Sequence, residues 1–365
     1  MKNTFGTSIC ITLFGESHGP EIGAVLDGLA PGIPVDEEAI RHDLTLRRPS
    51  GALSTARAEK DPFRIVSGVF RGRTTGAPIT VIIPNGERRS EDYEKTARIA
   101  RPSHADYTAE CKYHGFADFR GGGHFSGRLT APLVALGAIV RTALSARGVA
   151  LGTHILSLGG IADRPFLDAD ADVKTLNDRL FPVLSDEASE KMQAAILEAR
   201  RDGDSVGGIL ETVVLGVPAG VGEPFFDSVE STLSHMLFSI PAVKGVEFGS
   251  GFALGAMRGS EANDPFRCVD GRVVTESNHN GGILGGITSG MPILFRTAVK
   301  PTPSIYKEQR SISLDTLENT ALTIEGRHDP AIVHRARAVV DALAAIALAD
   351  LLAMRFGTDY FFPKM

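Results

Sequence analysis

Apolar residues repeat at intervals of three and four in several parts of the chain, which is the spacing of a helix with one buried face. This pattern predicts long helices at Asp36–Arg48, Ala131–Arg147 and Ala331–Arg355. A more polar helix is predicted at Glu187–Arg201. The chain is therefore expected to contain at least four helices.

Shorter runs that are rich in β-branched residues predict strands among these helices. The 40 glycines and 20 prolines of the chain mark turns between the segments. Because helices and strands are mixed without strict alternation, the pattern favours an α+β fold over a doubly wound parallel sheet. The predicted strands are Cys10–Phe14, Phe63–Phe70, Ile79–Ile83, Ile209–Val217, Val243–Met257 and Ile293–Val299.

Two stretches resemble each other. Leu26–Pro49 and Val214–Pro241 each run from a strand through a turn of the proline–glycine type and an amphipathic helix to a proline. Short strand–helix units also converge, so duplication and coincidence both remain open. We expect one domain over residues 1–365, with two pseudo-repeated halves at roughly 1–160 and 180–365 and a polar loop near Ala162–Asp178 between them.

Charge and composition narrow the function. A chain of 365 residues with 43% apolar content can build a large core. Its net charge of -6 argues against a main role in binding nucleic acid or an anionic membrane. Its basic residues comprise 28 arginines and 10 lysines, and arginine suits bidentate capture of carboxylate and phosphate. Three distant cysteines give no disulfide or metal framework. Met1–Phe14 lacks a signal-peptide pattern, so a cytoplasmic protein is expected.

The segment Gly15–Gly19 (GESHG) offers two kinds of chemistry. It matches the GxSxG pattern of a serine hydrolase, with Ser17 as the nucleophile after a strand. Pro20 and Gly23 follow closely, so the helix that such a site requires is not expected. His18, in the same turn, could instead meet an anion as an imidazolium.

Two glycine-rich segments could approach a ligand closely. Arg120–Arg128 contains three successive glycines and leads into a predicted helix, whose N-terminus favours an anion. Asn278–Ile287 contains two glycine pairs and precedes the cation and hydroxyls of Lys300–Ser304, a set that suits a phosphate-bearing cofactor. Tight turns explain each glycine cluster equally well when it is taken alone.

Two further arginine-containing segments lie at predicted helix ends. Asp329 followed by Pro330 is typical of a helix start, with Asp329 as the N-cap, and Arg327 lies at the same end. Arg47 and Arg48 lie at the C-terminus of the first predicted helix, where cations interact favourably with the helix dipole even without a function.

Taken together and in order, these motifs resemble those of the chorismate synthases over essentially the whole chain. This resemblance implies a βαβ sandwich fold with internal pseudo-symmetry, a homotetramer, and the 1,4-anti elimination of phosphate from 5-enolpyruvylshikimate 3-phosphate to give chorismate. It also implies a requirement for reduced FMN. The motifs are FGESHG, RRPSG, GVFRGRTTGAPI, RPSHADYT, FRGGGHFSGR, GDSVGG, IPAVKGVEFGSGF, SNHNGGILGGITSGMPI, KPTPS and GRHDP.

The resemblance implies roles for four arginines. The substrate carries two carboxylates and a phosphate, and on the family pattern Arg47, Arg48, Arg128 and Arg327 should bind them. Their convergence would create an anion-selective pocket in a chain that is acidic overall.

The same matching implies three catalytic residues. His18 resembles the general acid that protonates the departing phosphate. His104 resembles the second histidine, which lies by the flavin and keeps it in its useful protonation state. Asp329 resembles the carboxylate thought to accept a proton from the flavin. No metal is implied.

The implied flavin contacts include several positions where this chain departs from the common family pattern. RGGGHFSGRLT replaces the commoner RGGGRSSARET, and KPTPS replaces KPTSS, so Pro303 removes a hydroxyl and an N–H. The segment Ala52–Arg57 also lacks the usual arginine four residues beyond the proline. The implied FMN-binding residues are His124, Phe125, Ser126, Pro241, Ala242, Gly285, Lys300, Pro301, Thr302, Pro303, Ser304 and Arg327.

Two other function classes remain as alternatives to this lyase. One is the serine hydrolase built on Ser17, and the other is a non-catalytic protein that binds an anion or a flavin. The expected partners are the small-molecule substrate and a possible external flavin reductase, because the compact chain has no obvious extra segment for reducing its own flavin. A flavin-reductase assay of the protein with NADPH would test this expectation. No nucleic-acid or membrane partner is expected.

Overall fold

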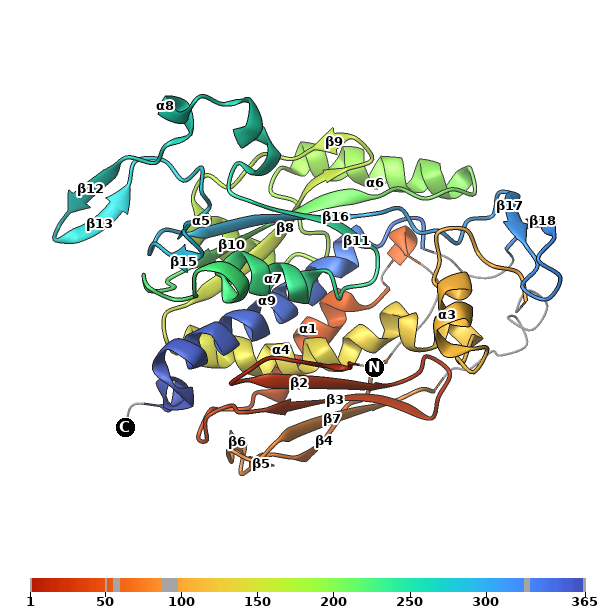
Figure 1. Cartoon of the computed structure of the whole chain (residues 1–365), viewed down its shortest axis with the longest axis horizontal. Coiled ribbons are helices and arrows are strands. Elements are labelled where there is room, and N and C mark those ends of the chain that lie inside the picture. The colour runs from red at the N-terminus through yellow and green to blue at the C-terminus, as the bar shows by residue number, and fades with distance from the viewer. Residues whose placement is uncertain (1, 50, 55–59, 87–97, 325–328, 364–365) are drawn as a thin grey trace.

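A computed structural model describes residues 2–49, 51–54, 60–86, 98–324 and 329–363 of the chain. Its main body has three layers, with a layer of helices between two β-sheets (Figure 1). All strand pairs in the described residues are antiparallel. The predicted α+β class is confirmed, and the arrangement is a βαβ sandwich.

The first sheet is built from the N-terminal part of the chain and forms the lower layer in Figure 1. Its strand order is β1-β2-β3-β7-β4. Apolar residues alternate with more exposed ones along β7, as expected for a strand that buries one face. The strands are β1 (Thr4–Phe5), β2 (Cys10–Gly15), β3 (Glu21–Asp27), β4 (Arg64–Ser67) and β7 (Ile79–Pro84).

The second sheet forms the layer on the other side of the helices, with strand order β11-β16-β10-β8-β9. Its central strand β10 pairs with β16 in continuous register from Gly208↔Val299 to Val214↔Ile293. The strands are β8 (Ala150–Leu158), β9 (Ile161–Ala162), β10 (Gly208–Leu215), β11 (Val243–Phe248) and β16 (Ile293–Val299).

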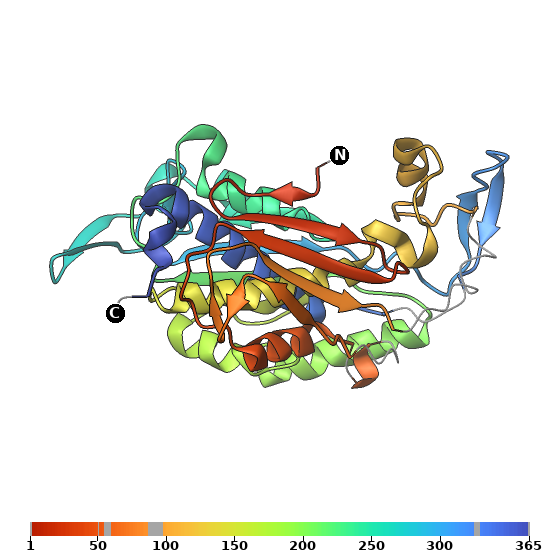
Figure 2. The same cartoon turned by 90° about the horizontal axis from the view of Figure 1, so that it is seen from below.

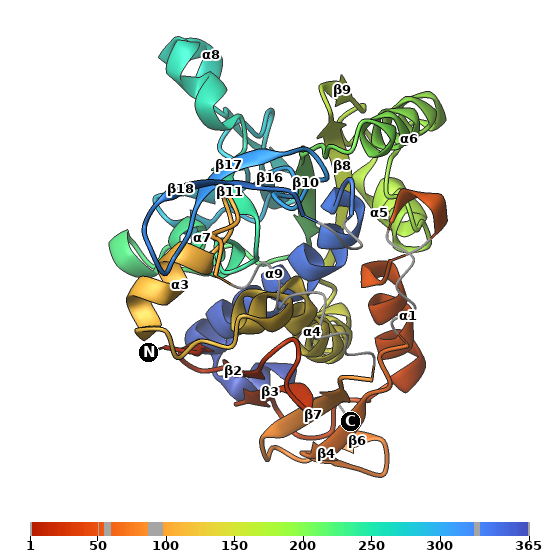
Figure 3. The ribbon, with the colours of Figure 1, turned by 90° about the vertical axis from the view of Figure 1, so that its right-hand side faces the viewer.

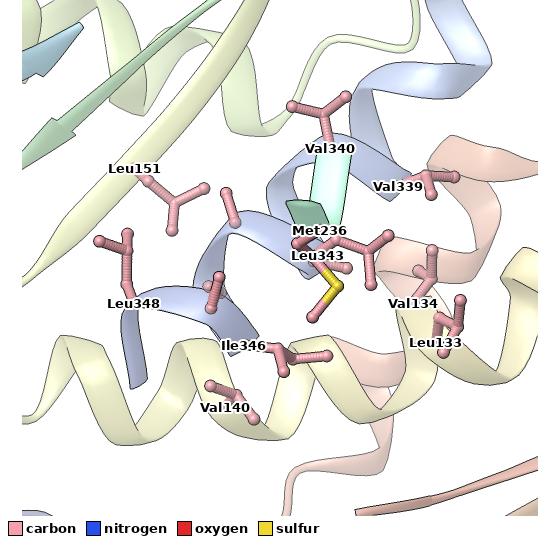
Figure 4. Packing of buried hydrophobic residues seen from close by; sticks show 14 of the residues in the cluster. Leu133, Val134, Val140, Leu151, Met236, Val339, Val340, Leu343, Ile346 and Leu348 are labelled. Atoms are coloured by element: carbon pink, nitrogen blue, oxygen red, sulfur yellow. The ribbon is translucent and has the colours of Figure 1, made fainter. Parts of the chain in front are cut away.

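The helix layer consists of α1 (Glu37–Arg47), α4 (Thr130–Ser145), α7 (Val229–Leu237) and α9 (Val333–Phe356). Figure 4 shows side chains of α4, α7, α9 and β8 meeting in one core. The labelled side chains are Leu133, Val134, Val140, Leu151, Met236, Val339, Val340, Leu343, Ile346 and Leu348. The three long helices predicted from apolar spacing are α1, α4 and α9, so the pattern identified them correctly.

Two buried aspartates fix the apolar helix α9 against both sheets. Asp350 accepts hydrogen bonds from the backbone N–H groups of Thr7, Ser8 and Ile9 at 3.0, 2.7 and 2.8 Å. Asp341 accepts one from the Thr153 hydroxyl at 2.6 Å. These bonds satisfy Asp350, whereas Asp341 Oδ2 makes no hydrogen bond in the described residues and lies 3.6 Å from Arg337 Nη1.

One described helical stretch, Gly127–Ser145, is long and apolar enough to cross a membrane by length and composition. Its most apolar window is 78% buried inside the protein. It contains α4, which both sheets cover in Figure 1, so its apolar character is explained by its place in the core.

Smaller elements surround the three layers. The hairpins β12–β13 (Phe266–Val269 and Arg272–Thr275) and β17–β18 (Gln309–Ile312 and Asn319–Leu322) project from opposite ends of the molecule (Figure 2). Other small helices and hairpins are α3 (Asp106–Tyr113), α5 (Ala169–Asn177), α6 (Asp186–Arg201), α8 (Gly259–Ala262), β5–β6 (Val69–Phe70, Arg73–Thr74) and β14–β15 (Ile283–Leu284, Ile287–Thr288). Helix α6 confirms the predicted polar helix.

Three expectations about local structure are corrected. The strand predicted at Val243–Met257 ends at Phe248, because Gly249 and Gly251 adopt left-handed backbone angles and a 3-10 helix follows. The polar stretch predicted as a loop at Ala162–Asp178 contains α5, which Asp168 caps. Asp329 is not the N-cap of the last helix, because α9 begins at Val333 with Ile332 in the cap position.

The ends of three core helices meet on one side of the molecule. Figure 3 views this side, with α3 and the β17–β18 hairpin nearest the viewer. The C-terminus of α1, the N-terminus of α4 and the N-terminus of α9 all point to it (Figure 1). Helix ends carry unpaired backbone groups and partial charges, so this side is suited to hold charged ligands.

Candidate active site

A glycine loop brings two of the predicted catalytic histidines together. Gly121 and Gly122 adopt left-handed φ angles of 59° and 83° in the short 3-10 segment Arg120–Phe125. A Cβ atom on Gly121 would lie 2.5 Å from His18 Cδ2, and one on Gly122 would lie 3.5 Å from His104 Nε2. The rings of His18 and His104 therefore face adjacent residues of a single loop, although 86 positions separate them in the chain.

The turn that carries His18 joins the antiparallel strands β2 and β3. Ser17 donates its backbone N–H to the Gly123 carbonyl at 3.0 Å, which ties the turn to the glycine loop. A hydrolase nucleophile lies on a strand-to-helix turn, whereas this turn leads directly into β3 at Glu21. The geometry is therefore against the hydrolase alternative, and it leaves His18, which is 6% exposed, as the chemical group of the motif.

Two charged neighbours fix the orientation of His104. Its Nδ1 lies 2.7 Å from Asp106 Oδ1 and 3.1 Å from Arg101 Nη2. Arg101 also grips Asp106 through two nitrogens, at 2.8 and 2.7 Å. Burial alone would raise the pKa of Asp106, but hydrogen bonds from Arg101 and His104 outweigh it and hold that pKa well below its usual range. An ionised carboxylate only accepts hydrogen bonds, so His104 Nδ1 carries a proton and donates it to Asp106, with Arg101 Nη2 as a neighbour rather than a hydrogen-bond partner of Nδ1. Nε2 is then the nitrogen directed at Gly122.

Three guanidinium groups surround one carboxylate next to this loop. Arg47 and Arg48, at the end of α1, lie 3.4 and 3.5 Å from Asp61 Oδ2. Arg128, in the 3-10 turn just before α4, pairs with the other oxygen of Asp61. The three predicted substrate-binding arginines that lie in the described residues therefore converge on Asp61.

Further hydrogen bonds hold Arg47 and Arg128 in this arrangement. Arg47 donates to the Thr130 hydroxyl at 2.9 Å and to the Gly127 carbonyl at 3.0 Å. Arg128 Nε donates to Asn85 Oδ1 at 3.2 Å. The amide of Asn85 in turn donates to the carbonyls of Glu16 and Gly19, at 3.0 and 2.9 Å. Asn85 thus connects the arginine cluster to the turn that carries His18.

Asp329 joins the same network through Arg335. The guanidinium of Arg335 pairs with the carboxylate of Asp329 and donates from Nε to the carbonyl of Arg47 at 2.9 Å. Asp329 is therefore linked to the arginine cluster through Arg335, and the turn that carries His18 is linked to it through Asn85. The fourth predicted arginine, Arg327, lies outside the described residues.

Part of the predicted FMN-binding set lies beside His104. Lys300 donates its backbone N–H to the carbonyl of Ala242 at 3.0 Å, and its ammonium group donates to the carbonyl of Ser103. Ala242 has a left-handed φ of 74°, and Pro241 before it is exposed. The segments that carry Ala242, Lys300 and His104 are therefore adjacent.

The segment Pro301–Ser304 contains an unsatisfied buried group. The Oγ1 atom of Thr302 is buried and makes no hydrogen bond among the described residues. Such an atom is costly unless a ligand or water satisfies it. The neighbouring residues are packed, because Gly207 closely approaches Pro301, the carbonyl of Pro303 accepts from Gln309 at 3.4 Å, and Ser304 is buried.

The remaining predicted FMN contacts differ in their surroundings. The His124 ring bonds the carbonyl of Gly15 at 2.8 Å, Phe125 makes an edge contact with Tyr113, and the Ser126 hydroxyl caps the next 3-10 turn. These residues are part of the glycine loop. Gly285 lies in the β14–β15 turn, on the side of the molecule away from α3 (Figure 1), so the structure does not bring it to the histidines.

Four residues of the site were not identified from the sequence. Asp106 follows His104 by two positions in RPSHADYT, a spacing that could have indicated a histidine–carboxylate pair. Asn85, Asp61 and Arg335 have no local signal, because each contacts a residue that is distant in the chain. Asn85 and Asp61 contact Arg128, 43 and 67 positions away, and Arg335 contacts the carbonyl of Arg47, 288 positions away.

Comparison with known proteins gives a consistent result. Residues 9–353 match the family model described as chorismate synthase. The chain is 47% identical to proteins named chorismate synthase from Korarchaeum cryptofilum, covering 95% of this chain and 96% of the relative, and from Dehalococcoides mccartyi, covering 98% of each. A solved structure titled as a crystal structure of chorismate synthase matches with a TM-score of 0.77 and 29% identity, over 97% of this chain and 94% of that one.

Proposed function

The chain belongs to the chorismate synthase family of lyases, and from this premise we propose that it eliminates phosphate from 5-enolpyruvylshikimate 3-phosphate to give chorismate. The reaction removes a proton from C6 and phosphate from C3 on opposite faces of the ring. The observation that carries the proposal is the meeting of His18 and His104 on the adjacent glycines Gly121 and Gly122, beside the arginine cluster.

The charge of the substrate supports the role of the arginine cluster. The substrate has two carboxylates and a phosphate, and guanidinium groups bind both through paired N–H donors. Arg48 and Arg128 have partly exposed side chains, 24% and 13%, so an anion in solution can reach them. The side chain of Arg47 is only 4% exposed, and its charge adds to the positive potential from inside the protein.

His18 is the proposed general acid. Negative charge develops on the phosphate oxygen as the C–O bond breaks, and a proton from an imidazolium neutralises it. The ring is held in a turn that Asn85 and Gly123 tie to the rest of the site. A fixed position is important because a proton can be transferred only across hydrogen-bonding distance.

His104 and Asp329 are the other proposed catalytic groups. Asp106 holds the proton of His104 at Nδ1, so that Nε2 can donate or accept a proton inside the site. Asp329 takes up the proton that the substrate loses at C6. Arg335 orients the carboxylate of Asp329 and keeps it near the carbonyl of Arg47.

Reduced FMN is the proposed cofactor, and the residues present fit it. The unsatisfied Thr302 hydroxyl offers a hydrogen bond, and Lys300 offers a cation next to the His104 loop. Reduced FMN, when bound, supplies the electron density that assists the elimination, and the reaction has no net redox change. Pro303 and Phe125 add no polar contact, so FMN is held here mainly by other residues of the set.

We also propose a cytoplasmic homotetramer that receives reduced flavin from an external reductase. Exposed aromatic side chains support assembly, because large apolar groups in contact with water often mark protein interfaces. Phe225, Phe226 and Phe252 are 86%, 92% and 88% exposed. We further propose that the chain consists of two pseudo-repeated halves, at roughly 1–160 and 180–365.

An anaerobic assay tests the proposed function. The purified protein is mixed with dithionite-reduced FMN and 5-enolpyruvylshikimate 3-phosphate, and chorismate and inorganic phosphate are measured together. We expect equal amounts of both products, and none with oxidised FMN. Flavin binding without release of phosphate would contradict the proposal and favour the non-catalytic alternative.

A further inference from the structure

A buried serine and a buried histidine form a pair between helix α9 and the segment that follows α1. The hydroxyl of Ser54 lies 3.0 Å from Nε2 of His334, and the two residues are 2% and 3% exposed. The ring of Phe181 packs on the imidazole, with 5.8 Å between the ring centroids. The proposed mechanism uses neither Ser54 nor His334, so catalysis does not explain this polar pair in the core.

The imidazole of His334 is uncharged. Burial and, to a smaller extent, the neighbouring charge of Arg335 lower the pKa of His334 to about 3. Its Nδ1 atom is buried and makes no hydrogen bond among the residues that the structure describes. A buried N–H group without an acceptor is rarer in proteins than a buried acceptor without a donor, so the proton lies on Nε2 and is donated to Ser54 Oγ. The pair is therefore a neutral hydrogen bond that adds no charge to the arginine cluster.

Ser54 lies between two residues of the arginine cluster along the chain. It follows Arg48 by six positions and precedes Asp61 by seven, and Nε of Arg48 lies 3.5 Å from Asp61 Oδ2. Arg48 also donates to the carbonyl of Lys60. Leu53, the residue before Ser54, packs against the hydrophobic core. The chain thus leaves the arginine cluster at Arg48, reaches α9 at Ser54 and is back at the cluster at Lys60.

His334 lies in the first turn of α9, beside a second residue that contacts the site. Arg335, the next residue, pairs with the carboxylate of Asp329 and donates to the carbonyl of Arg47 at 2.9 Å. Two consecutive residues of one helical turn therefore hold three separate points of the chain, at Ser54, Asp329 and Arg47. The start of α9 is a common anchor for them.

We propose that His334 is a positioning residue for the anion-binding site, and that its hydrogen bond to Ser54 fixes Arg48 and Asp61 relative to the start of α9. Such a bond adds little net stability, because both partners give up hydrogen bonds to water, but it is directional and selects one arrangement. An apolar pair of the same size would fill the space without that direction. A displaced guanidinium loses its paired contacts with an anion, so the effect appears in binding. The identity of the anion rests on the proposed function.

Two variants remove the hydrogen bond in different ways. Ser54→Ala deletes the hydroxyl, and His334→Leu replaces the ring with an apolar side chain. We expect each to bind inorganic phosphate about five- to tenfold more weakly than the wild type, measured by calorimetry at low salt. We expect KM for the enolpyruvyl substrate to rise by a similar factor with kcat within about twofold, because His18 and His104 keep their own contacts.

A conservative variant restores the bond without the ring. In His334→Gln the side-chain amide reaches the place of Nε2 and can donate to Ser54 Oγ. Because the bond is kept, this variant should bind phosphate within about twofold of the wild type. If His334→Leu also kept the wild-type affinity, packing on Phe181 rather than the hydrogen bond would position the segment, and the proposal would be wrong.

A matched control removes a buried hydroxyl that bonds another residue of α9. Thr153 donates its hydroxyl to Asp341 at 2.6 Å, and both residues are buried between α9 and the second sheet. Thr153→Val should lower the melting temperature but keep the phosphate affinity. Equal losses of phosphate affinity in Thr153→Val and Ser54→Ala would overturn the proposal, because they would report a general loosening around α9.

The failure of this inference differs from the failure of the proposed function. An unchanged phosphate affinity in Ser54→Ala would overturn the role of the pair, as would a wild type that binds no phosphate. The proposed function fails instead if the wild type forms no chorismate from the enolpyruvyl substrate and reduced FMN.

Discussion

Replacing His18 with alanine should lower kcat by about 10²–10⁴-fold while the protein stays folded. The imidazolium is the only proposed donor to the departing phosphate, and without it the phosphate must leave with its full negative charge. His18 lies in a turn between β2 and β3 rather than in the helical core, so the fold should tolerate the change. Anaerobic stopped-flow measurement of phosphate release gives kcat, and thermal unfolding monitored by circular dichroism gives the stability.

Two glycine variants test whether the loss depends on the position of His18. Gly121→Ala adds a methyl group 2.5 Å from His18 Cδ2 at a residue with a left-handed φ, so it should displace the ring and lower kcat by about 10–100-fold. Gly255 has open space around it, and Gly255→Ala should keep the wild-type rate. A rate for His18→Ala within about twofold of the wild type would exclude His18 as the general acid.

Replacing Arg128 with glutamine should lower kcat/KM by about 10²–10³-fold, mainly through weaker binding of substrate. The change removes a cation that faces the proposed phosphate or carboxylate and leaves Asp61 with fewer partners. Arg128→Lys keeps the charge but loses the paired donors, so its loss should be smaller, about 10–100-fold. Calorimetric titration with the substrate and steady-state kinetics measure the two contributions separately.

Arg120 provides a matched control from the same loop. Its guanidinium binds Asp118 through two nitrogens and is 42% exposed, and no contact joins it to the cluster around Asp61 in the described residues. Arg120→Gln should change kcat/KM by no more than about threefold. Equal losses for Arg120→Gln and Arg128→Gln would mean that net charge, rather than the position of Arg128, decides substrate binding.

The fold could be predicted from the sequence where one local pattern determines the structure. Apolar spacing located α1, α4 and α9, because each buries apolar residues in the core between the two sheets. The prediction failed where a turn or a long-range contact determines the end of a helix or strand. The strand after Val243 stops at Phe248 because two glycines turn the chain, and Asp329 pairs with Arg335 instead of capping α9.

The site could be predicted only in part, for a physical reason. His18, His104 and the arginines lie in motifs that are distinctive along the chain, so the sequence indicated them. Asp61 and Asn85 owe their roles to distant partners, and neither is distinctive in its own segment. The contact of one carboxylate with three arginines is recognised only when the ends of α1 and α4 are seen to meet.

The most direct test of the account is a crystal structure of the protein with FMN and 5-enolpyruvylshikimate 3-phosphate bound. We predict that the phosphate lies within about 3 Å of the His18 ring and of a guanidinium of the cluster around Asp61. We also predict that the flavin ring lies between the substrate and the segment of Lys300 and Thr302, with His104 beside it. A substrate bound away from His18 and Arg128, or a flavin bound away from His104, would contradict the central claim that these residues form one active site.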